Sequence, residues 1–337
     1  MYSIGIDVSK SSLNIHIPKN SLDLEIDNNL KALKSLYSKL KKIYKKEIDK
    51  LIFVYEPTGS YSALLYRFCA QKKIKVFMIN PKQSRNFAKA IAQRNKSDKI
   101  DAKVLSEAIV VAKESEIIIP FINPIVEEIK ELIAYYKLKV KLRVQLNNHL
   151  EALKAKGANK ALIASLKKDI AKIKKEEDSI IENIYSIITK DKELKAKYES
   201  IISIDGIGKV AAIVLLHLFI KYPNANQRQI VSLTGLDPIK RESGTSIRGK
   251  TRISKAGGKI YRATLFMPVM AAIRHNNQIK EFYNRLKANG KHTTVAQIAV
   301  MRKLIIIAHS LYKSKELYDK EKYLQNAGVQ KEEDLTS

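Results

Sequence analysis

The chain has 337 residues, of which 45% are hydrophobic, so it is long enough for two or three domains with sizeable cores. Its 62 lysines and arginines against 34 acidic residues give a net charge of +28, which indicates a polyanionic partner, with nucleic acid as the default. A single cysteine excludes a disulfide framework and a cysteine zinc site, and we expect a cytoplasmic protein with no signal peptide and no membrane span.

The first third of the chain alternates strand-like and helical segments. Strands are expected at residues 2–8, 13–17, 50–56 and 74–80. Helices are expected at residues 30–46, 61–73 and 81–92, the last with a proline in its first turn. This alternation predicts an α/β domain, which we place at residues 1–115.

A long helical stretch follows, from Ile125 to Ile188. Apolar residues recur there at steps of three and four, Glu177 interrupts them, and Gly157 and Asn159 mark a turn. This predicts an antiparallel helical hairpin or coiled coil within residues 116–197, and its seam is a candidate dimer interface. The sequence then predicts a mainly helical domain at 198–315 and a partly disordered tail at 316–337.

Four acidic residues in the first domain stand out. Asp7 lies within an apolar strand, where an unpaired charge is costly. Glu56 ends another strand, and Asp98 and Asp101 are spaced to share one face of a helix. Carboxylates are the ligands that Mg²⁺ takes from proteins, and two such ions can bracket a phosphodiester. The four acids therefore predict a metal site in the layout of an RNase H-like fold.

Each acid alone also has an ordinary interpretation. Asp98 follows Ser97, a fair helix N-cap, and Glu56 precedes Pro57 and would cap a turn. The stretch "GIDVSKSSLNI" also resembles the first phosphate loop of the actin-like sugar kinases and ATPases. Those proteins need a second glycine-rich loop in another α/β lobe, and the sequence predicts no such lobe.

The second half carries two patterns suited to phosphate. In "SIDGIGKVAAIVLL", Gly206 and Gly208 allow backbone amides to approach a phosphate at a helix N-terminus, with Lys209 beside them. This resembles the helix-hairpin-helix of DNA-binding proteins, and a plain glycine-bearing helix connection is the alternative. The second pattern is the glycine-rich stretch 242–258, whose candidate nucleic-acid-binding cations are Arg248, Lys250, Arg252 and Lys255.

The same stretch contains Ser243, Ser246 and Ser254. A serine in a loop is usually a turn residue. Cations or a metal ion nearby would allow one of them to attack phosphorus.

Together these segments resemble one family. The motifs occur in this order: "GIDVSK", "YEPTGSY", "NKSDKIDAKVL", "SIDGIGKVAA", "TGLDPIKRESG", "GKTRISKAGGKIYRATLFMPVMAAIRHN" and "KEFYNRLKANGKHTTVAQIAVMRKLIIIAHSLY". The chain resembles the DEDD transposases of the insertion-sequence-110 family, the bridge-RNA-guided serine recombinases, from about Ser3 to Tyr312.

The resemblance implies an N-terminal RuvC-like domain of RNase H fold, a coiled coil, and a C-terminal transposase domain. It implies that Ser243, in "GLDPIKRESG", is the nucleophile, with Ser246 as its nearest competitor. The implied catalytic and metal-binding tetrad is Asp7, Glu56, Asp98 and Asp101.

The resemblance also implies partners and a cofactor. These are Mg²⁺ with Mn²⁺ as a substitute, donor and target DNA, a structured noncoding bridge RNA that pairs with both, and homodimers that form a dimer of dimers. Such a protein excises and inserts its own element in the bacterial or archaeal cytoplasm, at the nucleoid. Sequence choice by base pairing fits a chain rich in cations and poor in aromatic residues.

The sequence departs from the family pattern at three places. Pro57 stands where a small residue is frequent, Gly257 and Gly258 replace a glycine–asparagine pair, and Glu177 breaks the helical seam. On the residues alone, two other functions compete. One is a metal-dependent structure-selective nuclease such as a Holliday-junction resolvase, with water as nucleophile, and the other is a non-catalytic nucleic-acid-binding scaffold.

Overall fold

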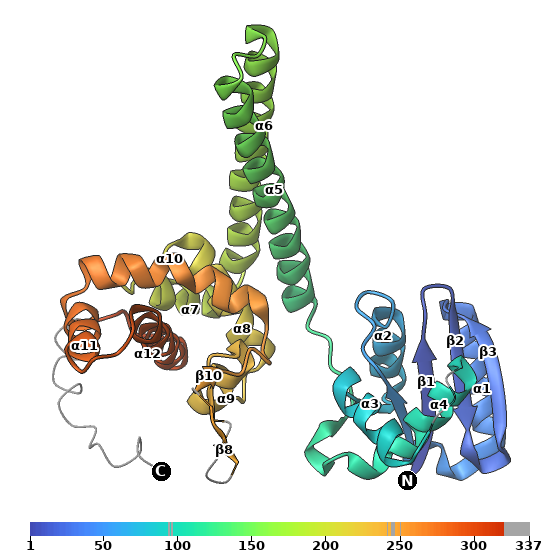
Figure 1. Cartoon of the computed structure of the whole chain (residues 1–337). Coiled ribbons are helices and arrows are strands. Elements are labelled where there is room, and N and C mark those ends of the chain that lie inside the picture. Colours follow the sequence, from blue (N-terminus) through green and yellow to red (C-terminus); the bar gives the residue numbers. More distant parts are fainter. Residues whose placement is uncertain (94, 96, 241, 244–246, 250, 320–337) are drawn as a thin grey trace. The chain divides into compact units, whose positions relative to one another are not determined.

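The chain folds into two compact units, Met1–Ile122 and Asn123–Ser337, in a computed structural model (Figure 1). The structure describes residues 1–93, 95, 97–240, 242–243, 247–249 and 251–319. Of the long helical region expected at 116–197, residues 123–197 belong to the second unit and residues 116–122 to the first. The predicted division between a helical region that ends at residue 197 and a domain at 198–315 stays a prediction.

The first unit is built on a mixed six-stranded sheet. Its strands are β1 (Tyr2–Val8), β2 (Ser12–Ile17), β3 (Leu22–Asp27), β4 (Leu51–Tyr55), β5 (Lys75–Met78) and β6 (Ile117–Ile118). They lie in the order β3-β2-β1-β4-β5-β6, with β1, β4 and β5 parallel and the other pairs antiparallel. The sequence predicted β1, β2, β4 and β5, and it missed β3 and β6.

Helices cover both faces of this sheet. They are α1 (Leu30–Tyr44), α2 (Ala63–Lys72), α3 (Pro81–Ala90) and α4 (Asp98–Glu107). Alternate residues of β1, such as Ile4 and Ile6, pack in one core with α1 and α2. Ile52 and Val54 of β4 face the other way and share a core with Leu105 of α4. This two-faced arrangement is compatible with an RNase H-like fold.

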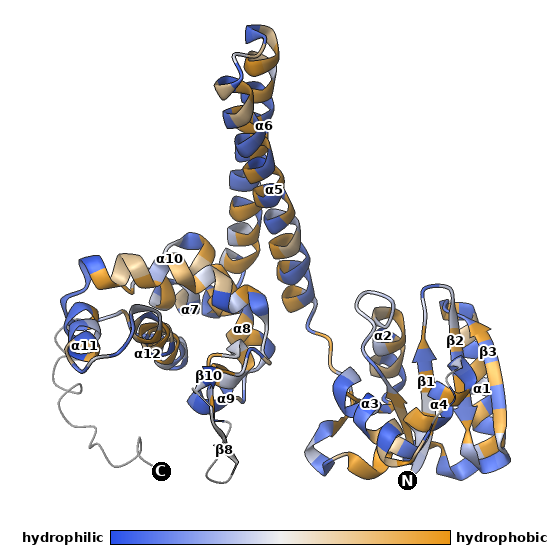
Figure 2. Ribbon diagram, viewed as in Figure 1, coloured by the Kyte–Doolittle hydropathy of each residue, from blue (hydrophilic) through white to orange (hydrophobic). Residues whose placement is uncertain are grey.

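The second unit begins with two long helices joined by a short turn, α5 (Pro124–Ala155) and α6 (Lys160–Thr189). Asn159, expected to mark the turn, caps α6 by accepting from the amide of Ala161. Figure 2 shows hydrophilic and hydrophobic residues interspersed along both helices. The remaining helices are α7 (Lys192–Ile202), α8 (Lys209–Lys221), α9 (Gln227–Thr234), α10 (Lys259–His275), α11 (Asn277–Ala288) and α12 (Thr293–Ser314).

Glu177 does not simply interrupt the hairpin seam, because it is buried in an ion pair across it. Only 1% of its side chain is exposed, and Nε of Arg143 on α5 donates to Oε1 at 2.6 Å. Lys174 lies 3.9 Å from Oε2 and is more than half exposed. The apolar pattern breaks at this position because a carboxylate there is paired with a cation from the facing helix.

We expect Arg143→Met to lower the free energy of unfolding by about 3 kcal/mol, because it leaves a buried carboxylate without its main partner. The double variant Arg143→Met/Glu177→Leu should recover most of that loss, since an apolar pair needs no compensating charge. Lys174→Met is the matched control and should cost less than about 1 kcal/mol. Urea unfolding measures all three, and equal losses for Arg143→Met and the control would contradict the burial argument.

The core of the second unit is formed around α8 and α12. Val300, Leu304 and Ile305 of α12 are buried with Leu216 of α8. Among the described residues α12 is the one helix long and apolar enough to cross a membrane, and half of its apolar window is buried inside the protein. Core helices meet the same criterion of length and composition, so α12 reads as a core helix.

Candidate active site

Asp7 and Glu56 lie at the carboxyl ends of neighbouring parallel strands. In the pairing of β1 with β4, Ile6 lies opposite Tyr55. The residues that follow these two in the chain are Asp7 and Glu56. Side chains alternate along a strand, and Asp7 therefore points away from the core that α1 and α2 cover. Asn14 of β2 is paired with Asp7 and is buried on the same face.

The other two acids arrive on α4. Asp98 and Asp101 occupy its first turn, and the Ser97 hydroxyl caps it by accepting from the amide of Ile100 at 3.4 Å. The N-cap interpretation of this segment is thus correct, and it does not conflict with a role in the site. Carboxylates in a first helical turn are also favoured by the helix dipole.

Gly5 allows α4 to reach the acids of the sheet. A Cβ atom on Gly5 would lie 1.9 Å from the carbonyl oxygen of Ala102 and 2.5 Å from the amide nitrogen of Ser106. Both atoms belong to the backbone of α4, so the helix axis has to lie directly on β1 at this point. Gly5 is two residues from Asp7, and Ala102 is next to Asp101, so this contact sets the approach of the two carboxylates.

The electrostatics of Asp7 register this approach. The pKa of Asp7 is raised to about 6, mainly by burial, and then by the negative charges of Asp101, Asp98 and Glu56. The other three acids predicted from the sequence therefore act electrostatically on Asp7 in the fold. An acidic group with such a raised pKa is typical of a functional site.

The donor chemistry fits a hard divalent cation. All four groups offer carboxylate oxygens, which are the ligands of Mg²⁺ and Mn²⁺. Burial is the largest cause of the raised pKa of Asp7, and a cation would neutralise the second cause, which is the negative charge of the other three acids. Within the described residues, however, no three His, Cys, Asp or Glu side chains are grouped closely enough to hold a metal ion as they stand. The carboxylates would have to close on the ion.

We expect Gly5→Ala to lower the free energy of unfolding by about 3 kcal/mol, at the upper end of the usual cost of overpacking, because the new methyl group meets backbone atoms. Gly59→Ala is the control in the same unit. It has a φ of +56° and nothing within 4 Å, so it should cost only about 1 kcal/mol of backbone strain. Urea unfolding compares the two, and a Gly5→Ala loss no larger than the control would rule out the close approach.

Ser243 lies in a small hairpin of the second unit. Strand β8 (Glu242–Ser243) pairs antiparallel with β9 (Ile247–Arg248), and Ser243 is opposite Ile247. Ser246 and Lys250, two of the predicted residues, lie outside the described residues. Arg252 and Lys255 are exposed further along the chain.

Ser254 lies at the base of this segment, where a second strand pair begins. Strand β7 (Pro238–Ile239) pairs with β10 (Arg252–Ile253), and the Ser254 hydroxyl donates to Oδ1 of Asp237 at 2.5 Å. The amide of Ser254 also donates to the carbonyl of Asp237. These two hydrogen bonds to Asp237 give Ser254 a structural role at the base of the loop rather than the role of a free nucleophile.

Arg262 closes the same base from α10. Its Nη1 donates to the carbonyls of Thr234 at 2.7 Å and Gly257 at 2.9 Å. A Cβ on Gly257 would lie 2.1 Å from the carbonyl oxygen of Leu233, so the two ends of the segment are packed backbone to backbone. Gly257 therefore lies at a close contact that needs glycine, and it corresponds to the glycine of the family's glycine–asparagine pair, whereas the departure is at Gly258.

The glycines of the "DGIGK" turn have different surroundings. Gly206 has a φ of +94°, and a Cβ there would lie 2.6 Å from the amide nitrogen of Ala272, so it packs against α10. Gly208 caps α8, and a Cβ on it would meet nothing within 4 Å, which leaves that helix end open. Lys209 is exposed and forms an ion pair with Glu182 at 3.0 Å. Gly208 and Lys209 are therefore exposed, as phosphate contact requires, whereas Gly206 is partly buried.

Sequence reasoning missed the residues that position the site. Gly5, Asp237 and Arg262 were not singled out in the sequence. A glycine inside a buried strand signals a close backbone approach, so Gly5 had a readable signal. Asp237 and Arg262 had none, because their partners are set by the fold.

Two family models match the chain. The DEDD transposase model of the IS110 type, described as "Transposase", matches residues 4–154, which include all four acids. The model described as "Transposase IS116/IS110/IS902 family" matches residues 198–284, which include Ser243 and the hairpin base.

Relatives extend the match. A pilin gene-inverting protein of Moraxella bovis is 27% identical over 94% of this chain and 97% of its own length. Its counterpart in Moraxella lacunata is 28% identical over 80% of this chain and 82% of its own length. An uncharacterized protein of the insertion element IS110 from Streptomyces coelicolor is 27% identical over 35% of this chain and 29% of its own length. With both family models placed on these sites, the chain belongs to the IS110 family of transposases and is an enzyme of DNA transposition and recombination.

Proposed function

We propose that this protein is an RNA-guided DNA recombinase that excises and inserts its own insertion element by strand cleavage and exchange. The observation that carries the proposal is the state of Asp7 on the central strand, where three further carboxylates help raise its pKa to about 6. A fold keeps such a costly cluster of charges where chemistry needs it. In this proposal the first unit has a RuvC-like fold of the RNase H class.

The DEDD transposase family depends on a divalent metal ion. In this protein Mg²⁺ would be held by Asp7, Glu56, Asp98 and Asp101, and it would supply Lewis-acid activation of the scissile phosphodiester. The pKa of Asp7 is raised first by burial and then by the negative charges of the other three acids, and a bound cation would offset those charges.

Ser243 is the proposed nucleophile. Its Oγ forms a bond to phosphorus, the bond from phosphorus to the leaving sugar oxygen breaks, and the serine proton ends on that oxygen. The product is a covalent serine–DNA phosphodiester, which conserves the bond energy for rejoining. Arg252 and Lys255, exposed near the hairpin, would neutralise charge that develops on the phosphoryl oxygens.

The nucleic-acid partners follow from charge. A net charge of +28 suits a protein that follows DNA and RNA backbones, with sequence choice left to base pairing with a bridge RNA. The proposed assembly is a homodimer that pairs into a dimer of dimers on nucleoid DNA, with the α5–α6 hairpin as a coiled coil and α7–α8 as a helix-hairpin-helix. The Moraxella relatives are named for inverting a pilin gene, and inversion also cuts and rejoins DNA.

The test is a reconstitution of strand exchange. The full chain is incubated with DNA containing the two element ends, Mg²⁺, and RNA transcribed from the sequence that flanks the gene. We expect circular excised DNA, a rejoined junction, and a protein–DNA adduct that survives denaturation. Omitting the RNA should stop all three.

The main competitor is a metal-dependent resolvase that uses water. It predicts nicks at branched DNA, no rejoined product, and no adduct that survives denaturation. Nicking of that kind would replace the recombinase proposal. DNA binding without cleavage at any Mg²⁺ concentration would instead favour a scaffold.

A further inference from the structure

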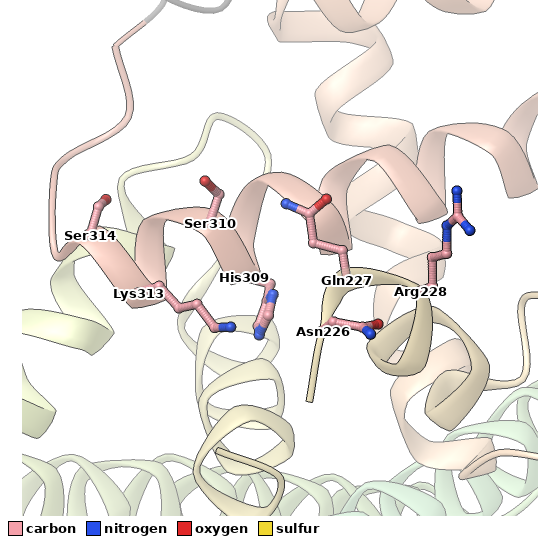
Figure 3. A pocket seen from close by; sticks show the side chains of 7 residues that line it. All are labelled: Asn226, Gln227, Arg228, His309, Ser310, Lys313 and Ser314. Atoms are coloured by element: carbon pink, nitrogen blue, oxygen red, sulfur yellow. The ribbon is translucent and has the colours of Figure 1, made fainter. Parts of the chain in front are cut away.

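An open pocket of about 830 Å³ lies between the start of α9 and the end of α12, within the second unit (Figure 3). None of the lining residues belongs to the motifs that the proposed chemistry uses. They are Asn226, Gln227, Arg228, His309, Ser310, Lys313 and Ser314.

The start of α9 leaves backbone donors at this pocket. The Asn226 side chain caps the helix by accepting from the amide of Gln229, and Oε1 of Gln229 accepts in turn from the amide of Asn226. The amides of Gln227 and Arg228, in the first two helical positions, have no partner inside the helix. They form the positive end of the helix dipole, which favours an anion.

His309 in the pocket wall is a buried polar group without a partner. Only 2% of it is exposed, and its ring packs against those of Phe219 and Tyr312. Its Nδ1 atom is buried and has no hydrogen-bond partner among the described residues. Figure 3 shows the ring reaching down from α12 between Lys313 and Asn226. Buried polar atoms in native proteins are normally satisfied, so an unpaired one in a pocket wall points to a ligand.

The remaining lining groups favour a negative ligand. Lys313 is exposed, lies 3.5 Å from the carbonyl of Ala225, and extends toward the His309 ring in Figure 3. Arg228 is a second exposed cation, on the far side of the α9 turn. Burial and the charge of Lys313 lower the pKa of His309 to about 4, so the ring is neutral and the positive charge comes from the lysine and the arginine. No carboxylate is among the lining residues.

We propose that this pocket binds one phosphate group of a nucleic-acid backbone, held by the start of α9, His309 and Lys313. A backbone diester continues on both sides of its phosphate, which requires an open pocket rather than a closed cavity. The choice of nucleic acid over free phosphate rests on the proposed function, and the +28 net charge favours it as well. The site is additional to the acids of the first unit and to the serine hairpin.

The test follows the ring of His309 in the full chain. The protein is made with isotope-labelled histidine for NMR spectroscopy. The NMR signal of the His309 ring is assigned among the six histidines by its absence in His309→Gln. Duplex DNA, single-stranded RNA and inorganic phosphate are titrated separately. We expect the His309 signal to shift at micromolar DNA or RNA, and the shift to disappear in Lys313→Gln. Lys280→Gln, which removes an exposed lysine of α11 outside the pocket, should keep it.

A binding measurement completes the test. Lys313→Gln should weaken nucleic-acid binding by about tenfold at low salt and reduce the slope of log affinity against log salt by about 0.9 for duplex DNA. A His309 signal that no nucleic acid moves would overturn the proposal. A signal that moves only with inorganic phosphate would overturn it as well, in favour of a free-anion site. If the unaltered protein does not exchange strands in the reconstituted reaction while nucleic acid still shifts the His309 signal, the recombinase proposal is refuted and the phosphate site stands.

Discussion

Ser243→Ala is expected to abolish strand exchange and to leave no protein–DNA adduct. If Oγ of Ser243 forms the bond to phosphorus, no other atom of the side chain can replace it, so the loss should exceed about a thousandfold. Binding of DNA and RNA should stay within twofold of the unaltered protein, since alanine removes neither charge nor backbone contact. The measurement is the yield of denaturation-resistant adduct and of rejoined junction in the reconstituted reaction.

Ser254→Ala is the matched control for that experiment. Ser254 is in the same basic segment, but its hydroxyl is bonded to Asp237 at the hairpin base. We expect this variant to keep the adduct and to lose thermal stability, because Asp237 loses its partner. Ser246→Ala is made alongside, since that serine is the nearest competitor in sequence. An adduct that survives Ser243→Ala and vanishes in Ser246→Ala would move the nucleophile by three residues.

The strands and helices that carry the acids were predictable because their signals are local. An apolar run with a single carboxylate identified β1, and the Ser97–Asp98 pair identified the start of α4. Strand β3 was missed although Leu22–Asp27 alternates apolar and acidic residues, which is the pattern of a half-buried strand. Strand β6 has two residues and leaves no periodicity to detect.

The site itself was predictable in membership and not in geometry. Spacing indicated that Asp98 and Asp101 share a face of a helix, but nothing local states which strand that helix crosses. The crossing is set by Gly5, whose missing side chain admits the α4 backbone. The interpretation of Glu177 failed for the same kind of reason, because its partner Arg143 lies 34 residues away on the facing helix.

Cations and carboxylates are distributed between the units in a way that fits one chemistry. The first unit contains Asp7, whose pKa is raised by burial and by the charges of the other three acids, and the second contains the exposed cations Arg252 and Lys255, which follow Ser243 in the sequence. The two family models divide the chain in the same manner, with the acids in one and the serine in the other. A reaction that needs both sets must bring together groups from two compact units, from one chain or from two.

Asp7→Asn is expected to lower the rate of strand cleavage and to raise the stability of the fold. Strand cleavage should fall by about a thousandfold or more, because the central carboxylate of the proposed metal site is lost. The protein without metal should become more stable at pH 7.5, by about 1–2 kcal/mol after allowance for the partial exposure of Asp7. A structural aspartate that is paired in the fold would give the reverse result, a loss of stability.

The stability gain of Asp7→Asn should depend on pH. The pKa of Asp7 is raised from 3.8 to about 6 in the folded chain, so its charged form is disfavoured by folding. The penalty is complete above pH 6 and disappears as the pH falls through the folded pKa toward 3.8. The stability gain of Asp7→Asn, measured by thermal unfolding in the presence of a chelator, should therefore shrink from pH 7.5 to pH 5. A stability gain that stays constant from pH 7.5 to pH 5 would mean that the substitution does not act by removing the charge of Asp7. Adding Mg²⁺ at pH 7.5 should narrow the difference in stability between the two proteins, because only the unaltered site gains a counter-charge.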